Sequence, residues 1–188
     1  MTTQLIEVKI QDSPKSWTDH AKLGADLAGP VIAAIFGIWV LRLTKRIEQN
    51  QWKNQKLIEK RILIWDQVGP MVNDIYCYCK RIGPWKKMTP ADIIERKRAA
   101  DKIIHVNRSY FSVEFFNSYM DFTEESFAMY QNHGDDAKIK TFIWEHKNAS
   151  AHWDDHWDLL IEDKLDENKL DHSYEIMIAQ LREDLISS

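Results

Sequence analysis

One uncharged apolar run constrains this 188-residue chain more than any other feature. Residues 27–41, LAGPVIAAIFGIWVL, carry no charged side chain. A helix over this run measures roughly 22 Å, which is short of the roughly 30 Å hydrocarbon core of a bilayer. Apolar residues extend the run to 23–43, where only Asp26 and Arg42 are charged and Arg42 can reach the headgroups. We therefore expect a transmembrane helix over residues 23–43, with a buried helix as the alternative.

The charged residues around this run predict its orientation. Basic residues crowd the segment that follows it, whereas the first 22 residues contain only three lysines. Because positive charge is retained on the cytoplasmic side, we expect residues 1–22 outside the cell and residues 44–188 in the cytoplasm. A cleaved signal peptide is disfavoured, since acidic residues precede the run and no small-residue cleavage site follows before Arg42. The chain is therefore expected to cross the membrane once.

Small residues recur at every fourth position within the predicted span. Ala25, Gly29, Ala33 and Gly37 would lie on one side of a helix, where they allow the backbone of a second helix to approach closely. We interpret this stripe as the self-association face of a homo-oligomer in the lipid bilayer. The alternative is ordinary membrane-helix composition, in which Gly and Ala are common.

The net charge of −4 hides a segregation of charge along the chain. Residues 42–110 contain 16 Lys and Arg against 7 Asp and Glu, whereas residues 111–188 contain 6 against 18. A basic middle segment beside an acidic C-terminal segment favours self-association, or attraction of an anionic partner to the middle segment alone. Solvated faces of one helical domain would also produce this pattern.

The chain beyond the apolar run has the periodicity of helices and predicts an all-α bundle. Thr89, Pro90 and Asp92 form a helix start, and Ser112 begins the next helix. Residues 5–10 alternate like a short strand. The expected helices cover residues 44–68, 71–81, 89–105, 112–134, 137–146, 147–163 and 173–186.

Cofactor and metal signals are weak. Cys77 and Cys79 stand one residue apart, which suits neither an ordinary disulfide nor a zinc knuckle, so we expect reduced residues in the core or at its boundary. The sequence contains no Gly-rich phosphate loop, and we expect no cofactor.

Residues 147–158, KNASAHWDDHWD, concentrate chemically active side chains. If they are helical, His152 and His156 share one face, while Trp153 and Trp157 lie on the adjacent face and point inward. Two such histidines could begin a metal site, but a third ligand would have to come from a distant histidine, such as His105 or His172. We therefore expect no metal.

Within this stretch, Lys147, Asn148 and His152 resemble the R-(N/H/D)-xxx-H signature of HEPN domains, which are all-α bundles found in many RNA-cleaving defence proteins. In such a site a cation holds the phosphate, a histidine moves a proton, and the RNA 2′-OH is the nucleophile. Lys147 replaces the arginine and cannot form the planar two-pronged contact with a phosphate, which weakens the case for catalysis. Arg98 and His105 fit a loose form of the signature, although a solvated basic face explains them as well.

The whole layout resembles one family: the small membrane accessory protein of type VI-B CRISPR systems, which accompanies an RNA-guided RNase in antiphage defence. The resemblance is carried by the span 23–43 and the three motif residues. It implies a ring-like homo-oligomer that forms a pore in the inner membrane and depolarises the infected cell, with RNA binding left open. The alternatives are a membrane-tethered HEPN ribonuclease and a membrane-anchored scaffold without activity of its own.

Overall fold

We describe the protein from a computed structural model over residues 17–128, 137–150 and 152–186, with side chains from Gly29 onward. The expected strand at residues 5–10 lies outside this described part. The chain forms two compact units, residues 1–51 and residues 52–188. We refer to the second unit as the helical domain.

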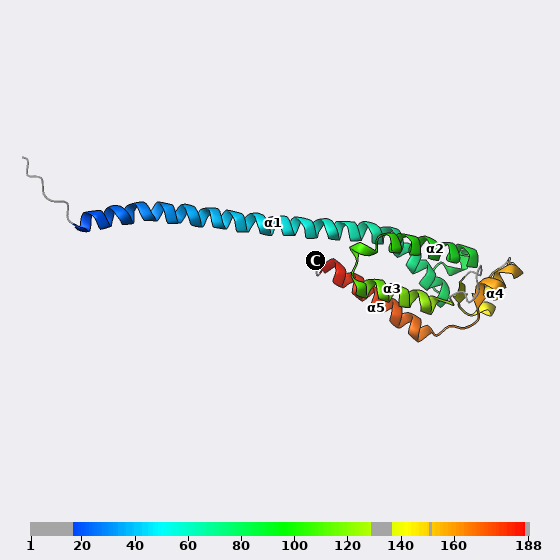
Figure 1. Cartoon of the computed structure of the whole chain (residues 1–188). Helices are drawn as coiled ribbons and strands as arrows, with labels where there is room; N and C mark the ends of the chain where they lie inside the picture. The colour runs from blue at the N-terminus through cyan, green and yellow to red at the C-terminus, as the bar shows by residue number, and fades with distance from the viewer. Residues whose placement is uncertain (1–16, 129–136, 151, 187–188) are drawn as a thin grey trace, which may run out of the picture. The chain divides into compact units, whose positions relative to one another are not determined.

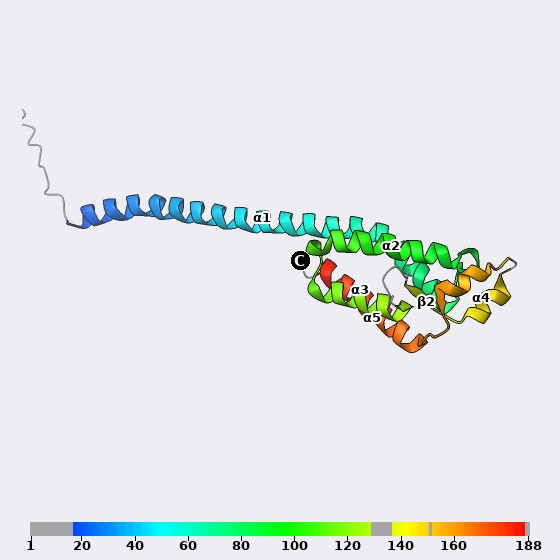
Figure 2. The same cartoon turned by 45° about the vertical axis from the view of Figure 1, so that its right-hand side comes forward.

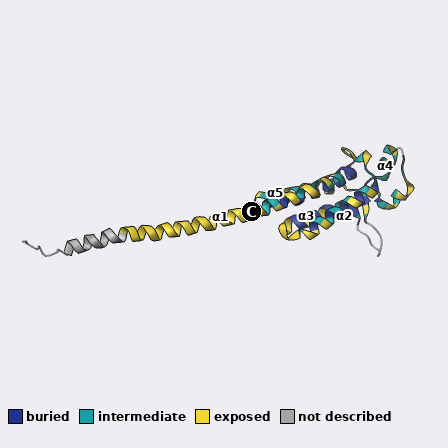
Figure 3. Cartoon of the chain, turned by 90° about the horizontal axis from the view of Figure 1, so that it is seen from above, coloured by how far each residue is buried: buried dark blue, intermediate teal, exposed yellow. Residues whose placement is uncertain are grey.

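Helix α1, Trp17–Lys80, begins in the first unit and ends in the helical domain (Figure 1). Its described side chains in the first unit, from Gly29 to Gln51, are all exposed (Figure 3). Several of them are large and apolar, among them Val31, Ile35 and Trp39. The described part of the first unit is therefore a helix whose apolar side chains are exposed from Gly29 onward.

The prediction of a transmembrane helix over residues 23–43 is wrong. Within the described residues, no helix is both long enough and apolar enough to cross a bilayer. From Gly29, the uncharged part of α1 ends before Arg42, which gives roughly 20 Å of helix against the roughly 30 Å required. The side chains of residues 23–28 lie outside the described set. The same finding overturns the predicted single-pass location in the inner membrane.

The helical domain is built from the last part of α1 and the helices α2 (Pro90–Val106), α3 (Val113–Ser126) and α5 (Glu167–Ile186). The predicted start of α2 is confirmed: the Thr89 side chain accepts from the Asp92 N–H, and the Asp92 carboxylate accepts from the Thr89 N–H. The predicted cap of α3 is also confirmed, since Ser112 Oγ accepts from the Phe115 N–H at 3.0 Å. These caps satisfy donors that the first turn of a helix leaves free.

The core of the helical domain lies between these helices, which carry most of its buried residues (Figure 3). Helices α3 and α5 lie side by side (Figure 2), and α1 and α2 complete the enclosure. Cys77 and Cys79 are buried, unbonded thiols, as their spacing predicted. The largest fully buried side chains are Tyr78, Tyr119, Phe115, Phe122, Phe127, Ile64, Ile75, Ile93, Ile104, Ile139, Leu170 and Met177.

The segment between α3 and α5 differs from the sequence prediction, which placed helices over residues 112–134, 137–146 and 147–163. It contains a small sheet of β1 (Phe127–Ala128), β2 (Lys138–Lys140) and β3 (Ile161–Glu162). β2 lies in the centre, antiparallel to β1 and parallel to β3. Ile139 pairs with Phe127 and Ile161, and its side chain is fully buried. Long-range pairing therefore decides the structure here.

The predicted helix over residues 147–163 is also wrong. Helix α4, Ile143–Ala149, covers only the beginning of this stretch. The short 3-10 helix η3, Asp155–Leu160, covers a later part of it. Asp154 caps η3, because its carboxylate accepts from the His156 N–H at 2.9 Å. Asp side chains compete for backbone donors in this way and interrupt a continuous helix.

Candidate ligand-binding site

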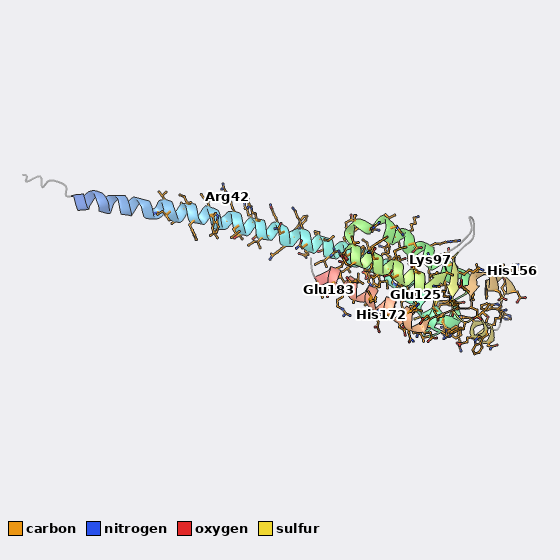
Figure 4. The ribbon with its side chains drawn as sticks, turned by 60° about the horizontal axis from the view of Figure 1, so that its bottom comes forward. Arg42, Lys97, Glu125, His156, His172 and Glu183 are labelled. Atoms are coloured by element: carbon orange, nitrogen blue, oxygen red, sulfur yellow. The ribbon has the colours of Figure 1, made fainter. Side chains whose placement is uncertain are left out.

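A cavity of about 390 Å³ lies at the end of the helical domain formed by α4 and η3. We call it the tryptophan pocket. Figure 4 places His156, on η3, at the opposite end of the helical domain from Glu183, on α5. The lining residues are Tyr78, Trp85, Lys86, Lys87, Met88, Thr89, His146, Ala149, Ser150, His152, Trp153 and Trp157.

The turn after α1 brings Trp85 back toward α4. Arg81 and Gly83 both have positive φ angles, of 58° and 60°. The Arg81 N–H donates to the Tyr78 carbonyl at 3.2 Å, which closes the end of α1. Arg81 is a costly residue at such an angle, and ion pairs of its side chain with Glu145 and Glu167 hold it in place. This turn leads directly into the short 3-10 helix η1, Trp85–Lys87.

His146 forms the buried floor of the site, with 3% of its surface exposed. Its ring stacks on Tyr78 at 4.2 Å between centroids and meets Trp85 edge to face at 4.9 Å. Its Nε2 lies 3.0 Å from Thr141 Oγ1, and the Thr141 hydroxyl donates to the Cys79 carbonyl at 3.1 Å. Because that hydroxyl proton is used, Nε2–H is assigned as the donor to Thr141.

The charge state of His146 follows from its surroundings. Burial, and then the positive charge of Arg81, lower the pKa of His146 to about 4. The ring is therefore neutral at pH 7, with the proton on Nε2 and an acceptor at Nδ1. A neutral imidazole of this kind recognises a ligand by hydrogen bonding and stacking, and it adds no charge.

Tyr78 is fully buried, and its hydroxyl has no hydrogen-bond partner among the described residues. Burial, as the main cause, raises the pKa of Tyr78 above its ordinary range, so the hydroxyl keeps its proton. A buried hydroxyl without a partner costs about 1–3 kcal/mol. Such groups are rare in folded proteins and mark places where a ligand, an ion or a water supplies the missing bond.

Two further tryptophans line the pocket. Trp153 and Trp157 meet edge to face with centroids 5.2 Å apart. The indole N–H of Trp153 donates to Asp158 at 2.8 Å, and the same carboxylate accepts from Lys147 Nζ at 2.6 Å. These bonds lower the pKa of Asp158, with the bond from Lys147 as the larger cause. The carboxylate therefore fixes Trp153 while it remains ionised.

The residues of the predicted HEPN-like motif do not form one site in the structure. Lys147 is paired with Asp158 and does not line the pocket, and Asn148 is exposed. His152 lies beyond the end of α4, lines the pocket and is exposed. Trp144, on α4, is 59% exposed and lies outside the pocket lining.

The other predicted residues lie elsewhere. Arg98 and His105 are exposed on α2, outside the tryptophan pocket, and the His105 ring meets Phe116 edge to face at 5.3 Å. His152 and His156 do not share a helical face, because α4 ends between Lys147 and His152.

The small-residue stripe is only partly described. Gly29, Ala33 and Gly37 are exposed on α1, whereas the Ala25 side chain lies outside the described residues. A Cβ atom added at Gly29 or Gly37 would meet nothing within 4 Å.

Tyr78, Trp85 and His146 line the pocket but were not among the site residues predicted from the sequence. The sequence signal for this part of the pocket was the run YCYCKRIGPWKKMTP. In it, a Gly-Pro turn is followed by a tryptophan, two lysines and the cap of the next helix. No protein family, curated protein or solved structure matches this chain.

Proposed function

We propose that the helical domain binds a small planar ligand in the tryptophan pocket. The observation that carries this proposal is the Tyr78 hydroxyl, which is fully buried, lacks a partner among the described residues and belongs to a residue that lines the cavity. A ligand that bonds to this hydroxyl would offset its desolvation cost of about 1–3 kcal/mol.

The size and composition of the pocket support this proposal. A volume of about 390 Å³ falls within the roughly 300–1,000 Å³ of small-molecule sites. Trp85, Trp153 and Trp157 all line the pocket, so a flat ring can be held by aromatic contacts. Tyr78, Ser150 and the neutral His146 are the lining residues whose polar groups would orient the ligand.

Binding explains this arrangement better than RNA cleavage does. In the ribonuclease alternative, a cation and a histidine act together on one phosphate. Here Lys147 is held by Asp158 outside the pocket lining, whereas His152 lines the pocket. The role in type VI-B CRISPR defence that the resemblance implies stays a prediction.

The test uses the purified full-length chain and a library of planar aromatic compounds, read by tryptophan fluorescence and by melting temperature. We expect a binding compound to quench fluorescence and raise the melting temperature, and Trp85→Leu to abolish both effects. Trp144→Leu is the matched control, because Trp144 is exposed on α4 and does not line the pocket. Equal loss of binding in both variants would contradict the proposal.

Self-association through α1 is a second proposed function. Its supporting observation is the set of large apolar side chains exposed on one helix, which exceeds the scattered apolar residues usual on a protein surface. The members between residues 31 and 43 are Val31, Ile32, Ile35, Phe36, Ile38, Trp39, Val40, Leu41 and Leu43. The oligomer would bury these side chains against a second copy of the chain.

A further inference from the structure

We propose that the ligand of the tryptophan pocket is a nucleoside phosphate, with the base against the tryptophans and the phosphate at Lys86 and Lys87. This assignment rests on the proposed function and adds the chemical class of the ligand. Four features of the site lead to it: its charge, its aromatic walls, its polar interior and the state of the neighbouring helix end.

The charge of the lining selects an anion. None of the residues that line the pocket is acidic, and Lys86 and Lys87 are exposed lysines at its edge. Neither lysine forms an ion pair with a carboxylate in the described part of the chain. Lys86 Nζ lies 5.5 Å from the centre of the Trp85 ring, which places a positive charge beside an aromatic wall. This local excess of positive charge is notable because residues 111–188 contain 18 acidic side chains.

The aromatic walls select a planar group next to the anion. Indole rings bind nucleobases by stacking, and they do so for every base because each has a π-face. The Asp158 carboxylate restrains Trp153 through its indole N–H, and Trp157 supports it edge to face. A wall that is held in advance loses little conformational freedom when a ring stacks on it. Purines offer the larger stacking surface, so we expect them to bind more tightly than pyrimidines.

The polar interior suits a base edge or a ribose hydroxyl. The Tyr78 hydroxyl can donate one hydrogen bond and accept another, and His146 Nδ1 is an acceptor while the ring is neutral. Nucleosides carry both donors and acceptors. A purely apolar aromatic ligand would leave the Tyr78 hydroxyl unsatisfied.

The start of α2 is not the phosphate site. Thr89 and Asp92 already bond to each other's backbone N–H groups, and the Asp92 carboxylate occupies the positive end of the helix. The Thr89–Asp92 bonds lower the pKa of Asp92, so this negative charge persists at neutral pH. The two lysines must therefore neutralise the phosphate.

The test is isothermal titration of the full-length chain with adenosine and guanosine monophosphates, the matching nucleosides and inorganic phosphate. We expect the monophosphates to bind roughly tenfold or more tightly than the nucleosides, with an affinity that falls as salt concentration rises. The double variant Lys86→Ala/Lys87→Ala should remove this advantage. Lys164→Ala, an exposed lysine outside the pocket, is the matched control. Circular dichroism of each variant checks that it is folded.

The outcomes of these titrations bear differently on the two proposals. Equal affinity for nucleosides and monophosphates, or an unchanged affinity in the lysine variant, would overturn the phosphate assignment. Binding of a different planar compound, with no nucleotide bound, would also overturn it while leaving the proposed function intact. If no planar compound binds, both proposals fail. Tighter binding of an oligonucleotide with a 5′-phosphate than of its 5′-hydroxyl form would support the assignment and identify a nucleic-acid end as the source.

Discussion

At the scale of single residues, the tryptophan pocket is organised by two buried groups that carry no charge. Tyr78 keeps its proton because burial raises its pKa, and His146 loses its proton because burial lowers its pKa. Their rings stack at 4.2 Å, so each contributes to the environment of the other. The polar groups of the site are therefore neutral inside, and its positive charge lies at the edge.

The change Tyr78→Phe tests the unsatisfied hydroxyl. Removing the hydroxyl without altering the ring should raise the free energy of unfolding by about 1 kcal/mol. The reason is that the folded state no longer carries the cost of burying a hydroxyl without a hydrogen-bond partner. The same variant should bind the pocket ligand more weakly. Urea denaturation of the free protein and titration with the ligand measure the two effects. A lower stability of the free variant would show that the hydroxyl has a partner in solution.

His146 makes stability depend on pH. Its folded pKa of about 4 lies below the unfolded value of about 6.5, so the unfolded chain binds the proton first as pH falls. The contribution of His146 is therefore complete above pH 6.5 and is lost between pH 6.5 and pH 4, by roughly 3 kcal/mol at most. Denaturation of the parent and of His146→Phe at both pH values measures it. A pH dependence that is identical in the two proteins would contradict this linkage.

At the scale of elements, the sequence predicted helix starts better than it predicted the segment between α3 and α5. Thr89 and Ser112 cap helices through side chains three residues from their partners, so local sequence is sufficient. Ile139 joins a sheet because Phe127 and Ile161 pair with it, and such partners are invisible to local periodicity. The pocket was missed for the same reason, because it joins Tyr78 with His146 from a distant part of the chain.

The end of α4 determines what His152 can do. Because α4 stops at Ala149, His152 is exposed, and its backbone N–H donates to Ser150 Oγ at 3.3 Å. His152→Ala should therefore leave the melting temperature unchanged, contrary to a buried structural role. Differential scanning calorimetry of the variant checks this expectation. A melting temperature several degrees lower would indicate that His152 is packed in solution.

At the scale of the whole molecule, the apolar run of residues 27–41 predicted a membrane span that the structure does not support. Its composition indicated a membrane span, but the described run is too short once Arg42 follows. Lys147 pairs with Asp158, whereas the His152 N–H bonds to Ser150, and the resemblance that was carried by that span and by the HEPN-like motif stays a prediction. What remains from the sequence is a helical domain and an exposed apolar helix.

The change Gly37→Leu tests self-association through that helix. A Cβ atom at Gly37 meets nothing within 4 Å in a single chain, so the larger side chain does not disturb the fold of the monomer. If copies pack along α1 near this residue, the leucine must separate their axes, because side chains at the contact set the interhelical distance. We therefore expect a smaller or weaker oligomer, measured by light scattering after size-exclusion chromatography. Gln49→Leu, exposed on the same helix, is the control. An unchanged oligomer with Gly37→Leu would place the contact elsewhere on the chain.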